Sequence, residues 1–174
     1  MVLYSFVVPD DSRPDLALLT GIGGGGVLLG MALADLAEAW QGRPYSLHLY
    51  RDDGSIQAGL GNLTAFLRHV DGAWRVVRLE VALGAAEVSL DGKSLTGLTV
   101  ERLAERGARR RPIDETHQVW TVEDYVAYFV EDDAVVDVML AWPRYDDDPA
   151  TGDDAERARG QTALTTALAA IAAG

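Results

Sequence analysis

The chain has 174 residues, of which 48% are hydrophobic and 24% are charged, a composition typical of a globular protein and not of a disordered one. This length allows one ordinary domain or two small ones. The absence of cysteine excludes disulfides, thiolate metal sites and cysteine nucleophiles. A net charge of −12 opposes binding to a phosphate backbone, so we expect no nucleic-acid partner.

Residues 16–34 resemble a membrane span because these 19 residues carry no charge. Six of them are glycine, however, and the flanking residues Asp15 and Asp35 are acidic. Continuous helix formers and positive flanks are both missing, so we predict no membrane span. Residues 1–11 lack the basic region of a secretory signal. Together with the lack of cysteine, this favours a cytoplasmic protein.

In chain order, the first half predicts a strand, a short apolar run, a glycine-rich hinge, a helix and three further strands. The helix prediction rests on Leu33, Leu36 and Trp40, which lie at i, i+3 and i+7 and so share one face. Asp71 and Gly72 form the dipeptide preferred in a type I′ turn between the last two strands. The predicted ranges are Val2–Val8, Leu16–Leu19, Gly21–Gly26, Ala32–Trp40, Tyr45–Arg51, Leu63–Val70 and Trp74–Leu83.

The second half predicts a second helix and a second group of strands. Thr99 is the predicted N-cap of that helix, because a threonine hydroxyl can accept a hydrogen bond from a backbone N–H of the first turn. Val100, Leu103 and Ala104 form its predicted buried face. The predicted strands are Val88–Leu90, His117–Val122, Tyr125–Val130 and Val135–Trp142, followed by an acidic loop and a C-terminal helix over Arg159–Ala172.

The most informative pattern is an internal repeat, in which helix residues recur at an offset of 67 and strand residues at 59. It predicts an α+β fold, a tandem repeat of a helix plus three or four antiparallel strands with the helices packed on one face of the sheet. The predicted segments are a strand and hinge (1–26), two repeats (27–83 and 84–142) and the acidic loop with the last helix (143–174). The recurring residues are Leu28, Gly30, Leu36, Ala37 and Glu38, answered by Leu95, Gly97, Leu103, Ala104 and Glu105, and Val77, Leu79 and Val81, answered by Val136, Val138 and Leu140.

The glycine run carries a competing pattern. Gly21, Gly23 and Gly26 match the dinucleotide fingerprint, in which glycines let a pyrophosphate approach a helix N-terminus. Asp52 follows the next predicted strand and would bind a ribose hydroxyl. The alternative function is therefore a nucleotide or small-ligand binding protein. Against it, five glycines in six residues match almost any glycine pattern, and a hairpin follows where a second βα unit is required.

No catalytic or metal-binding motif is apparent in the sequence. His48, His69 and His117 lie in separate predicted strands and lack paired metal-ligand spacing. The acidic clusters 131–133 and 146–148 lack the alternating ligands and fixed glycine of a calcium loop. We therefore expect a protein that is not an enzyme and has no cofactor or metal, while a site assembled from separate strands stays open.

Acidic residues are concentrated late in the chain. Residues 131–156 include ten acidic residues and one basic residue and so carry −9. Aromatic residues ringed by charge are typical of protein-binding hot spots. The predicted residues for binding a basic partner protein are Trp142, Tyr145, Asp146, Asp147 and Asp148. Two alternatives stay open: a loop that only increases solubility, and a Trp142 that continues the strand stripe into the core.

The segments Leu28–Met31 and Leu95–Thr99, each leading into a short helix and then hairpins, resemble the repeat unit of β-lactamase-inhibitor-protein-like and small outer-membrane-lipoprotein domains. The similarity covers residues 27–142. The inhibitor-like domains are tandem duplications of about this length that bind another protein. In composition the chain is also similar to immunity proteins of bacterial toxin systems. The resemblance implies a non-catalytic protein-binding module, an immunity or inhibitor protein that neutralises a basic toxin or enzyme.

Overall fold

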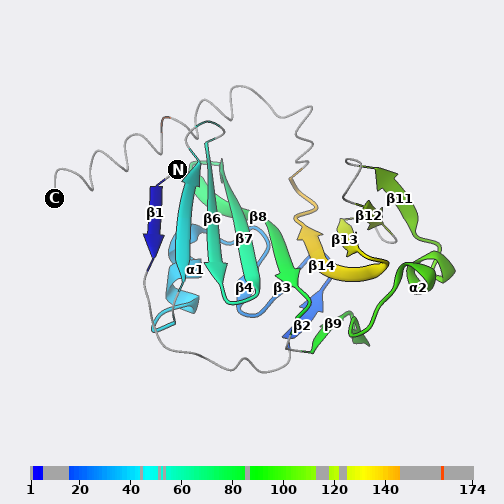
Figure 1. Ribbon diagram of the computed structural model, residues 1–174. Helices are drawn as coiled ribbons and strands as arrows, with labels where there is room; N and C mark the ends of the chain where they lie inside the picture. The colour runs from blue at the N-terminus through cyan, green and yellow to red at the C-terminus, as the bar shows by residue number, and fades with distance from the viewer. Residues whose placement is uncertain are drawn as a thin grey trace.

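The computed structural model describes residues 2–5, 16–43, 45–50, 52, 54–84, 87–112, 118–121, 125–145 and 162. Within these residues the strands form a nine-stranded antiparallel sheet and a smaller five-stranded sheet (Figure 1). Two short helices, α1 and α2, lie toward opposite ends of the large sheet.

The large sheet has the strand order β1-β5-β6-β7-β8-β14-β13-β12-β11. Neighbouring strands follow one another along the chain from β5 to β8 and from β11 to β14, whereas β1 pairs with β5 across an intervening segment. Strands β8 and β14 meet in the middle, where Leu79 pairs with Leu140 and Val81 with Val138. The strands are β1 (Val2–Ser5), β5 (Ser46–Tyr50), β6 (Ser55–Leu60), β7 (Leu63–Val70), β8 (Ala73–Ala82), β11 (Arg109–Pro112), β12 (Gln118–Thr121), β13 (Val126–Glu131) and β14 (Ala134–Ala141).

The small sheet has the order β10-β9-β2-β3-β4 and contributes to the same hydrophobic core as the large one. Leu18 and Val27 from this sheet are fully buried with Leu63 and Leu79 of the large sheet. Strands β2 and β9 run parallel, and the other pairs are antiparallel. The strands are β2 (Leu16–Leu19), β3 (Gly23–Gly24), β4 (Val27–Leu28), β9 (Val88–Leu90) and β10 (Lys93–Ser94).

The predicted fold, an α+β tandem repeat of a helix plus three or four antiparallel strands, is wrong, because the described residues are mostly β-strand in two sheets. Helices α1 (Leu33–Ala39) and α2 (Val100–Glu105) have seven and six residues, and each has one buried residue. Helices this short cannot provide the predicted layer over a nine-stranded sheet, and the five-stranded sheet contributes much of the cover instead. The prediction failed because residues 16–28, interpreted as an apolar run and a hinge, form three strands.

Both helices are tied to the large sheet by their backbone at the N-terminus. Ala32 forms an isolated bridge to Arg75, and Thr99 forms one to Ala134. The predicted cap at Thr99 is confirmed, since the Arg102 backbone N–H donates to its hydroxyl at 3.4 Å. The predicted type I′ turn is also confirmed by positive φ angles of 50° at Asp71 and 78° at Gly72.

The predicted stripe of β8 and β14 is buried at five of its six positions, and only Val136 is partly exposed. The register between β7 and β8 shifts so that Phe66 pairs with Arg78 and Leu67 with Val76, which leaves Val77 without a pairing partner. An extra residue of this kind is a β-bulge, and it reverses the inside–outside phase of the strand. Val76 therefore joins the core cluster, while Val77 also stays buried, with 1% of its surface exposed. By the same kind of shift Val135 joins the cluster in place of Val136.

No helix among the described residues is long and apolar enough to cross a membrane. The predicted C-terminal helix and Asp146–Asp148 lie outside the described residues, apart from Thr162.

Candidate functional site: an apolar tip on a glycine-rich meander

The glycine run is part of a three-stranded meander. Strand β2 pairs with β3, and β3 pairs with β4, both antiparallel. The turn between β2 and β3 is closed by the Ile22 N–H, which donates to Leu19 O at 3.1 Å, and Leu29 N–H donates back to Ile22 O at 2.8 Å. Two of the three strands have only two residues each. The meander therefore depends on close backbone packing for its shape.

Glycine is required in this meander because other backbone and core atoms occupy the space of a side chain. A Cβ on Gly23 would overlap the carbonyl of Val27, and one on Gly24 would overlap the carbonyl of Ala17. A Cβ on Gly25 would lie 2.8 Å from side-chain atoms of both Leu16 and Leu63. These glycines pack strand against strand and strand against core, which is a structural reason for the run.

The strands around the described glycines do not form the dinucleotide-binding fold that the alternative interpretation requires. Strand β2 turns directly into an antiparallel neighbour, whereas the dinucleotide fold needs a strand that leads into a helix and a parallel strand. Gly25 lies beside Leu63, at the β6–β7 turn, whereas Asp52 lies in the β5–β6 turn at the other end of β6. Six strand residues separate the two ends by roughly 17 Å. Asp52 is therefore not brought beside the glycines.

Three large apolar side chains project from this meander into solvent. Leu19, Ile22 and Leu28 are 47%, 52% and 54% exposed, and Tyr125 at 50% is the other large exposed hydrophobic residue among those described. Leu19 and Leu28 both pair with Gly23, from opposite sides of β3. We call Leu19, Ile22 and Leu28 the apolar tip.

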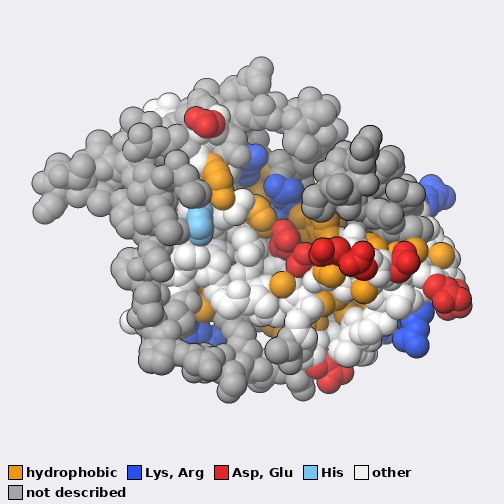
Figure 2. Space-filling model, viewed as in Figure 1, with side chains coloured by type: hydrophobic (Ala, Val, Ile, Leu, Met, Phe, Trp, Pro, Cys, Tyr) orange, Lys and Arg blue, Asp and Glu red, His pale blue; other side chains and the backbone are white. Residues whose placement is uncertain are grey.

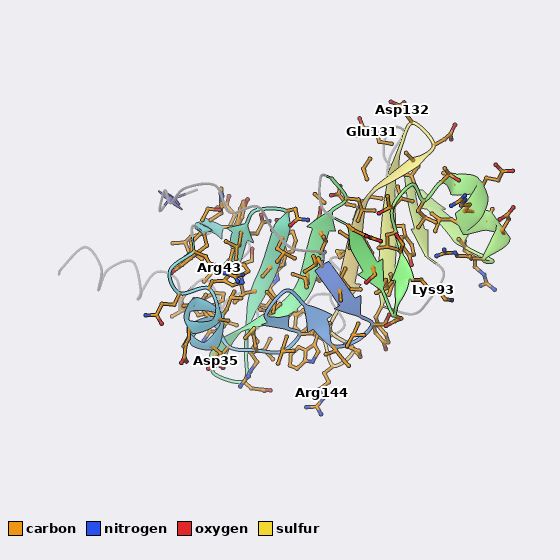
Figure 3. The ribbon with its side chains drawn as sticks, turned by 90° about the horizontal axis from the view of Figure 1, so that it is seen from below. Asp35, Arg43, Lys93, Glu131, Asp132 and Arg144 are labelled. Atoms are coloured by element: carbon orange, nitrogen blue, oxygen red, sulfur yellow. The ribbon has the colours of Figure 1, made fainter. Side chains whose placement is uncertain are left out.

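The chain beyond β14 lies against two glycines of the region that carries the apolar tip, Gly21 and Gly30. A Cβ on Gly30 would lie 2.6 Å from the indole ring of Trp142, so the bare glycine leaves room for this ring. Likewise, a Cβ on Gly21 would lie 3.5 Å from Pro143. The Trp142 backbone N–H donates to Val77 O at 2.8 Å, at the bulge of β8. Arg144 projects from the molecule beside the meander (Figure 3).

Hydrogen bonds hold the meander in place at both ends. The Arg75 guanidinium donates to Gly30 O at 3.1 Å. At the other end, the hydroxyl and backbone N–H of Thr20 donate to the two carboxylate oxygens of Asp91 at 2.6 and 2.9 Å. The hydroxyl, followed by the N–H, lowers the pKa of Asp91 from its ordinary 3.8. The apolar side chains are thus carried by a fixed backbone.

The structure places only part of the predicted partner-binding set. Trp142 and Tyr145 are half-buried, and the Tyr145 N–H donates to Trp142 O at 2.9 Å. Trp142 contacts Gly30 and is partly exposed, so it is neither a free surface residue nor a fully buried core residue. Asp146, Asp147 and Asp148 lie outside the described residues.

The sequence interpretation missed the exposure of the apolar tip. Leu19 lies in the predicted apolar run and Leu28 begins the recurring residues of the first predicted repeat, and apolar residues in such patterns are normally expected to be buried. The available signal was their position among glycines, since a glycine strand offers no side chains to cover its neighbours. The position among glycines does not by itself show which side chains are exposed, because that depends on how the three strands of the meander pair.

The open face of the large sheet carries a second group of polar residues. Acidic side chains form a row over β14 and toward α2 (Figure 2). Burial, followed by the charge of Asp137, raises the pKa of Glu80 in β8, and Arg78 acts in the opposite direction. Burial, followed by Glu131, raises the pKa of Asp137 in β14. In the described part of the chain, no group of three or more histidine or acidic side chains has a metal-binding arrangement.

Comparison with known proteins gives no relative: no protein-family model, no curated protein and no solved structure matches the chain. The resemblance to inhibitor-like domains therefore stays a prediction from the residues that carry it.

Proposed function

We propose that this chain is a non-catalytic protein-binding module that binds a basic partner protein through the apolar tip and the adjoining Trp142–Tyr145 segment. The observation that carries the proposal is the clustering of Leu19, Ile22 and Leu28 on one short meander. Exposed apolar side chains scattered singly are ordinary, whereas a cluster beside aromatic residues is typical of an interface.

The stiffness of the meander supports this proposal. Close contacts at the glycines and the anchors at Arg75 and Asp91 fix the backbone that carries the tip. A preformed surface loses little conformational entropy on association, so more of its contact energy is available for affinity. Trp142, half-buried on Gly30, adds an aromatic surface of the kind enriched in hot spots.

The charge of the neighbouring sequence supports a basic partner. Tyr145 is followed in the chain by Asp146, Asp147 and Asp148, within a segment that carries −9. Acidic residues at the rim of an apolar contact favour a positively charged partner and disfavour an acidic one. The resemblance to inhibitor-like domains and to immunity proteins agrees with this role, and a toxin or enzyme in the cytoplasm is the partner that we propose.

The test begins with the immobilised chain and an extract of its source cells. A basic protein retained on the chain is purified, and its dissociation constant is measured against the wild type and the double variant Ile22→Ser/Leu28→Ser. We expect binding at least tenfold weaker, about 1.4 kcal/mol, because hot-spot side chains each contribute on this scale or above. The matched control is Tyr125→Ser, a similarly exposed residue in the turn before β13.

The melting temperatures of both variants should equal that of the wild type, which separates lost contact from lost fold. The proposal is wrong if no basic protein is retained, or if the retained protein binds the double variant as tightly as the wild type.

A further inference from the structure

The chain leaves β14 through a tight turn over Trp142–Tyr145. The Tyr145 backbone N–H donates to Trp142 O at 2.9 Å, so the turn spans four residues with Pro143 and Arg144 in its middle. Proline is favoured at the second position of such a turn because its ring fixes φ. Arg144 is therefore held at the outer corner of a short and stiff turn.

The two residues before Arg144 pack on the meander. The Trp142 ring lies 2.6 Å from the position of a Cβ on Gly30, and Pro143 lies 3.5 Å from that of a Cβ on Gly21. The Trp142 backbone N–H also donates to Val77 O at 2.8 Å. The turn is thus attached to the meander on one side and to strand β8 on the other.

These contacts place Arg144 beside the apolar tip. Ile22 follows Gly21 in the chain and Arg144 follows Pro143, so each is one Cα step of about 3.8 Å from a contacting residue. Arg144 is exposed and projects from the molecule next to the meander (Figure 3). A partner that covers Ile22 therefore comes within reach of the Arg144 guanidinium.

A guanidinium at the edge of an apolar contact discriminates among partners. It has five N–H donors and no acceptor, and it forms bidentate hydrogen bonds with a carboxylate. A partner that brings a basic or an apolar group against it leaves the cation partly desolvated without a counter-charge, which disfavours binding. Tryptophan, tyrosine and arginine are also the residue types most enriched in hot spots, and residues 142–145 contain all three.

We propose that Arg144 is a specificity-determining residue of the apolar tip, and that the partner places an aspartate or glutamate side chain against it, next to the apolar side chains that contact Ile22. This inference rests on the proposed function and narrows the class of partner. The partner is basic overall, which favours its encounter with the acidic chain, but it carries a carboxylate where it contacts the tip.

The test uses a phage-displayed library of random peptides as the probe, selected on the full chain. Peptides that bind the wild type but not the double variant Ile22→Ser/Leu28→Ser are the ones that contact the tip. We expect these peptides to contain aspartate or glutamate beside apolar residues. Arg144→Glu should weaken their binding about tenfold or more. Arg144→Lys keeps the charge but not the bidentate fork, so it should weaken binding only about threefold.

A charge exchange provides the control for direct pairing. Replacing the acidic residue of a selected peptide by arginine should weaken binding to the wild type and restore binding to Arg144→Glu. Arg106→Glu makes the same change in net charge at an exposed position, the C-cap of α2, and should alter binding less than about twofold. The melting temperatures of these variants should equal that of the wild type, because both arginines are exposed.

Tip-dependent peptides that lack an acidic residue, or that bind Arg144→Glu as tightly as the wild type, would overturn this proposal and leave the apolar tip as a binding surface. An equal loss of binding in Arg106→Glu would assign the effect to net charge and would also overturn it. If no selected peptide distinguishes the wild type from the double variant, this proposal and the proposed function of the tip are both wrong.

Discussion

Glycines between positions 21 and 30 have two different structural roles. Gly23, Gly24 and Gly25 allow strands and core side chains to approach, so they define the meander. Gly30 has a φ of +86°, and the absence of a side chain there leaves room for the Trp142 ring. It therefore links the meander to the segment after β14, which makes it the residue on which the proposed surface depends most.

Gly30→Ala should destabilise the protein by about 2–4 kcal/mol, because it adds both backbone strain and a clash with the indole ring. Gly42→Ala is the control, since Gly42 has a similar φ of +77° but no atom within 4 Å of an added Cβ. It should cost only about 1 kcal/mol from backbone strain. Urea unfolding measures the free energy of unfolding of both variants. Equal losses of stability would mean that the Trp142 ring does not pack closely on Gly30.

The conformation of single residues was predictable from the sequence where it depends only on neighbouring residues in the chain. The Thr99 cap and the Asp71-Gly72 turn follow from side-chain and backbone chemistry that acts over a few residues. The burial of Val76 beside Val77 was not predictable in this way, because a bulge is set by the pairing strand. The exposure of Leu28 likewise depends on which strands surround it.

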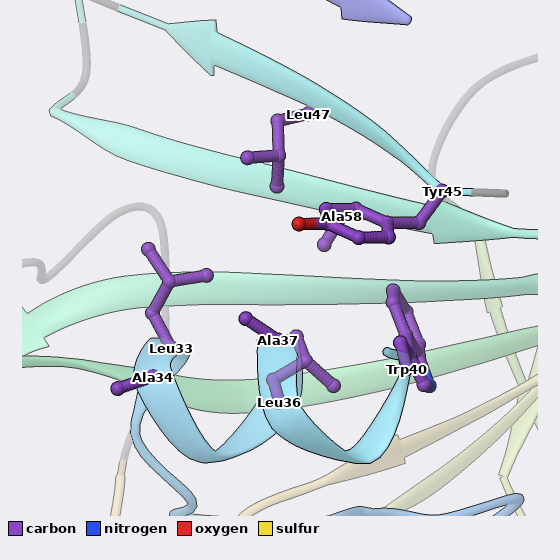
Figure 4. Close-up of a pocket in the computed structure, with 8 residues that line it drawn as sticks. All are labelled: Leu33, Ala34, Leu36, Ala37, Trp40, Tyr45, Leu47 and Ala58. Atoms are coloured by element: carbon purple, nitrogen blue, oxygen red, sulfur yellow. The ribbon is translucent and has the colours of Figure 1, made fainter. Parts of the chain in front are cut away.

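At the scale of elements, strand length did not decide which strands were predicted, since the three-residue β9 was predicted at its observed bounds and the six-residue β6 was missed. β7 was predicted at its observed bounds, since its alternation extends over eight residues. The two-residue strands β3 and β4 carry no alternation, and their glycines predict a hinge. These two strands belong to the second sheet, so without them the predicted fold had only one sheet and relied on helices to cover it. The half-open apolar pocket between α1 and strands β5 and β6 (Figure 4) was also beyond the sequence pattern, since it depends on how the helix sits on these strands.

The pairing of β8 with β14 brings two carboxylates together, and it predicts a pH dependence. The pKa of Glu80 is raised above its ordinary 4.5 by burial and then by Asp137. Between the unfolded and folded pKa values the native state binds more protons than the unfolded state, so stability falls as pH rises through that window. Glu80→Gln should therefore raise the melting temperature at pH 7 and lose this advantage below pH 4.5.

The control for this prediction is Glu101→Gln, which removes an equal charge from an exposed position on α2. Thermal unfolding between pH 4 and pH 7.5 provides the comparison. The role assigned to the carboxylate pair is wrong if Glu80→Gln and Glu101→Gln show the same pH profile as the wild type.

On the scale of the whole molecule, the two ends of the described part of the acidic segment, residues 131–145, lie on opposite sides of the protein. Glu131 and Asp132 project from one side of the protein, and Arg144 projects from the opposite side, beside the meander (Figure 3). Exposed charges are screened beyond about 8 Å at physiological ionic strength. The acidic residues that matter for a partner at the apolar tip are therefore expected to be those that follow Tyr145 in the chain.

Association with a basic partner should slow as salt rises, and Asp146, Asp147 and Asp148 should carry most of that dependence. Changing these three residues to asparagine should reduce the association rate about tenfold at low salt and flatten the salt dependence, with the melting temperature almost unchanged. The same charge is removed by changing Glu131 to glutamine and Asp132 and Asp133 to asparagine, and this control should have a much smaller effect. Stopped-flow kinetics over a range of salt concentrations distinguishes the two variants. Equal effects of the two would mean that net charge alone, and not a steering rim beside the apolar tip, speeds the encounter.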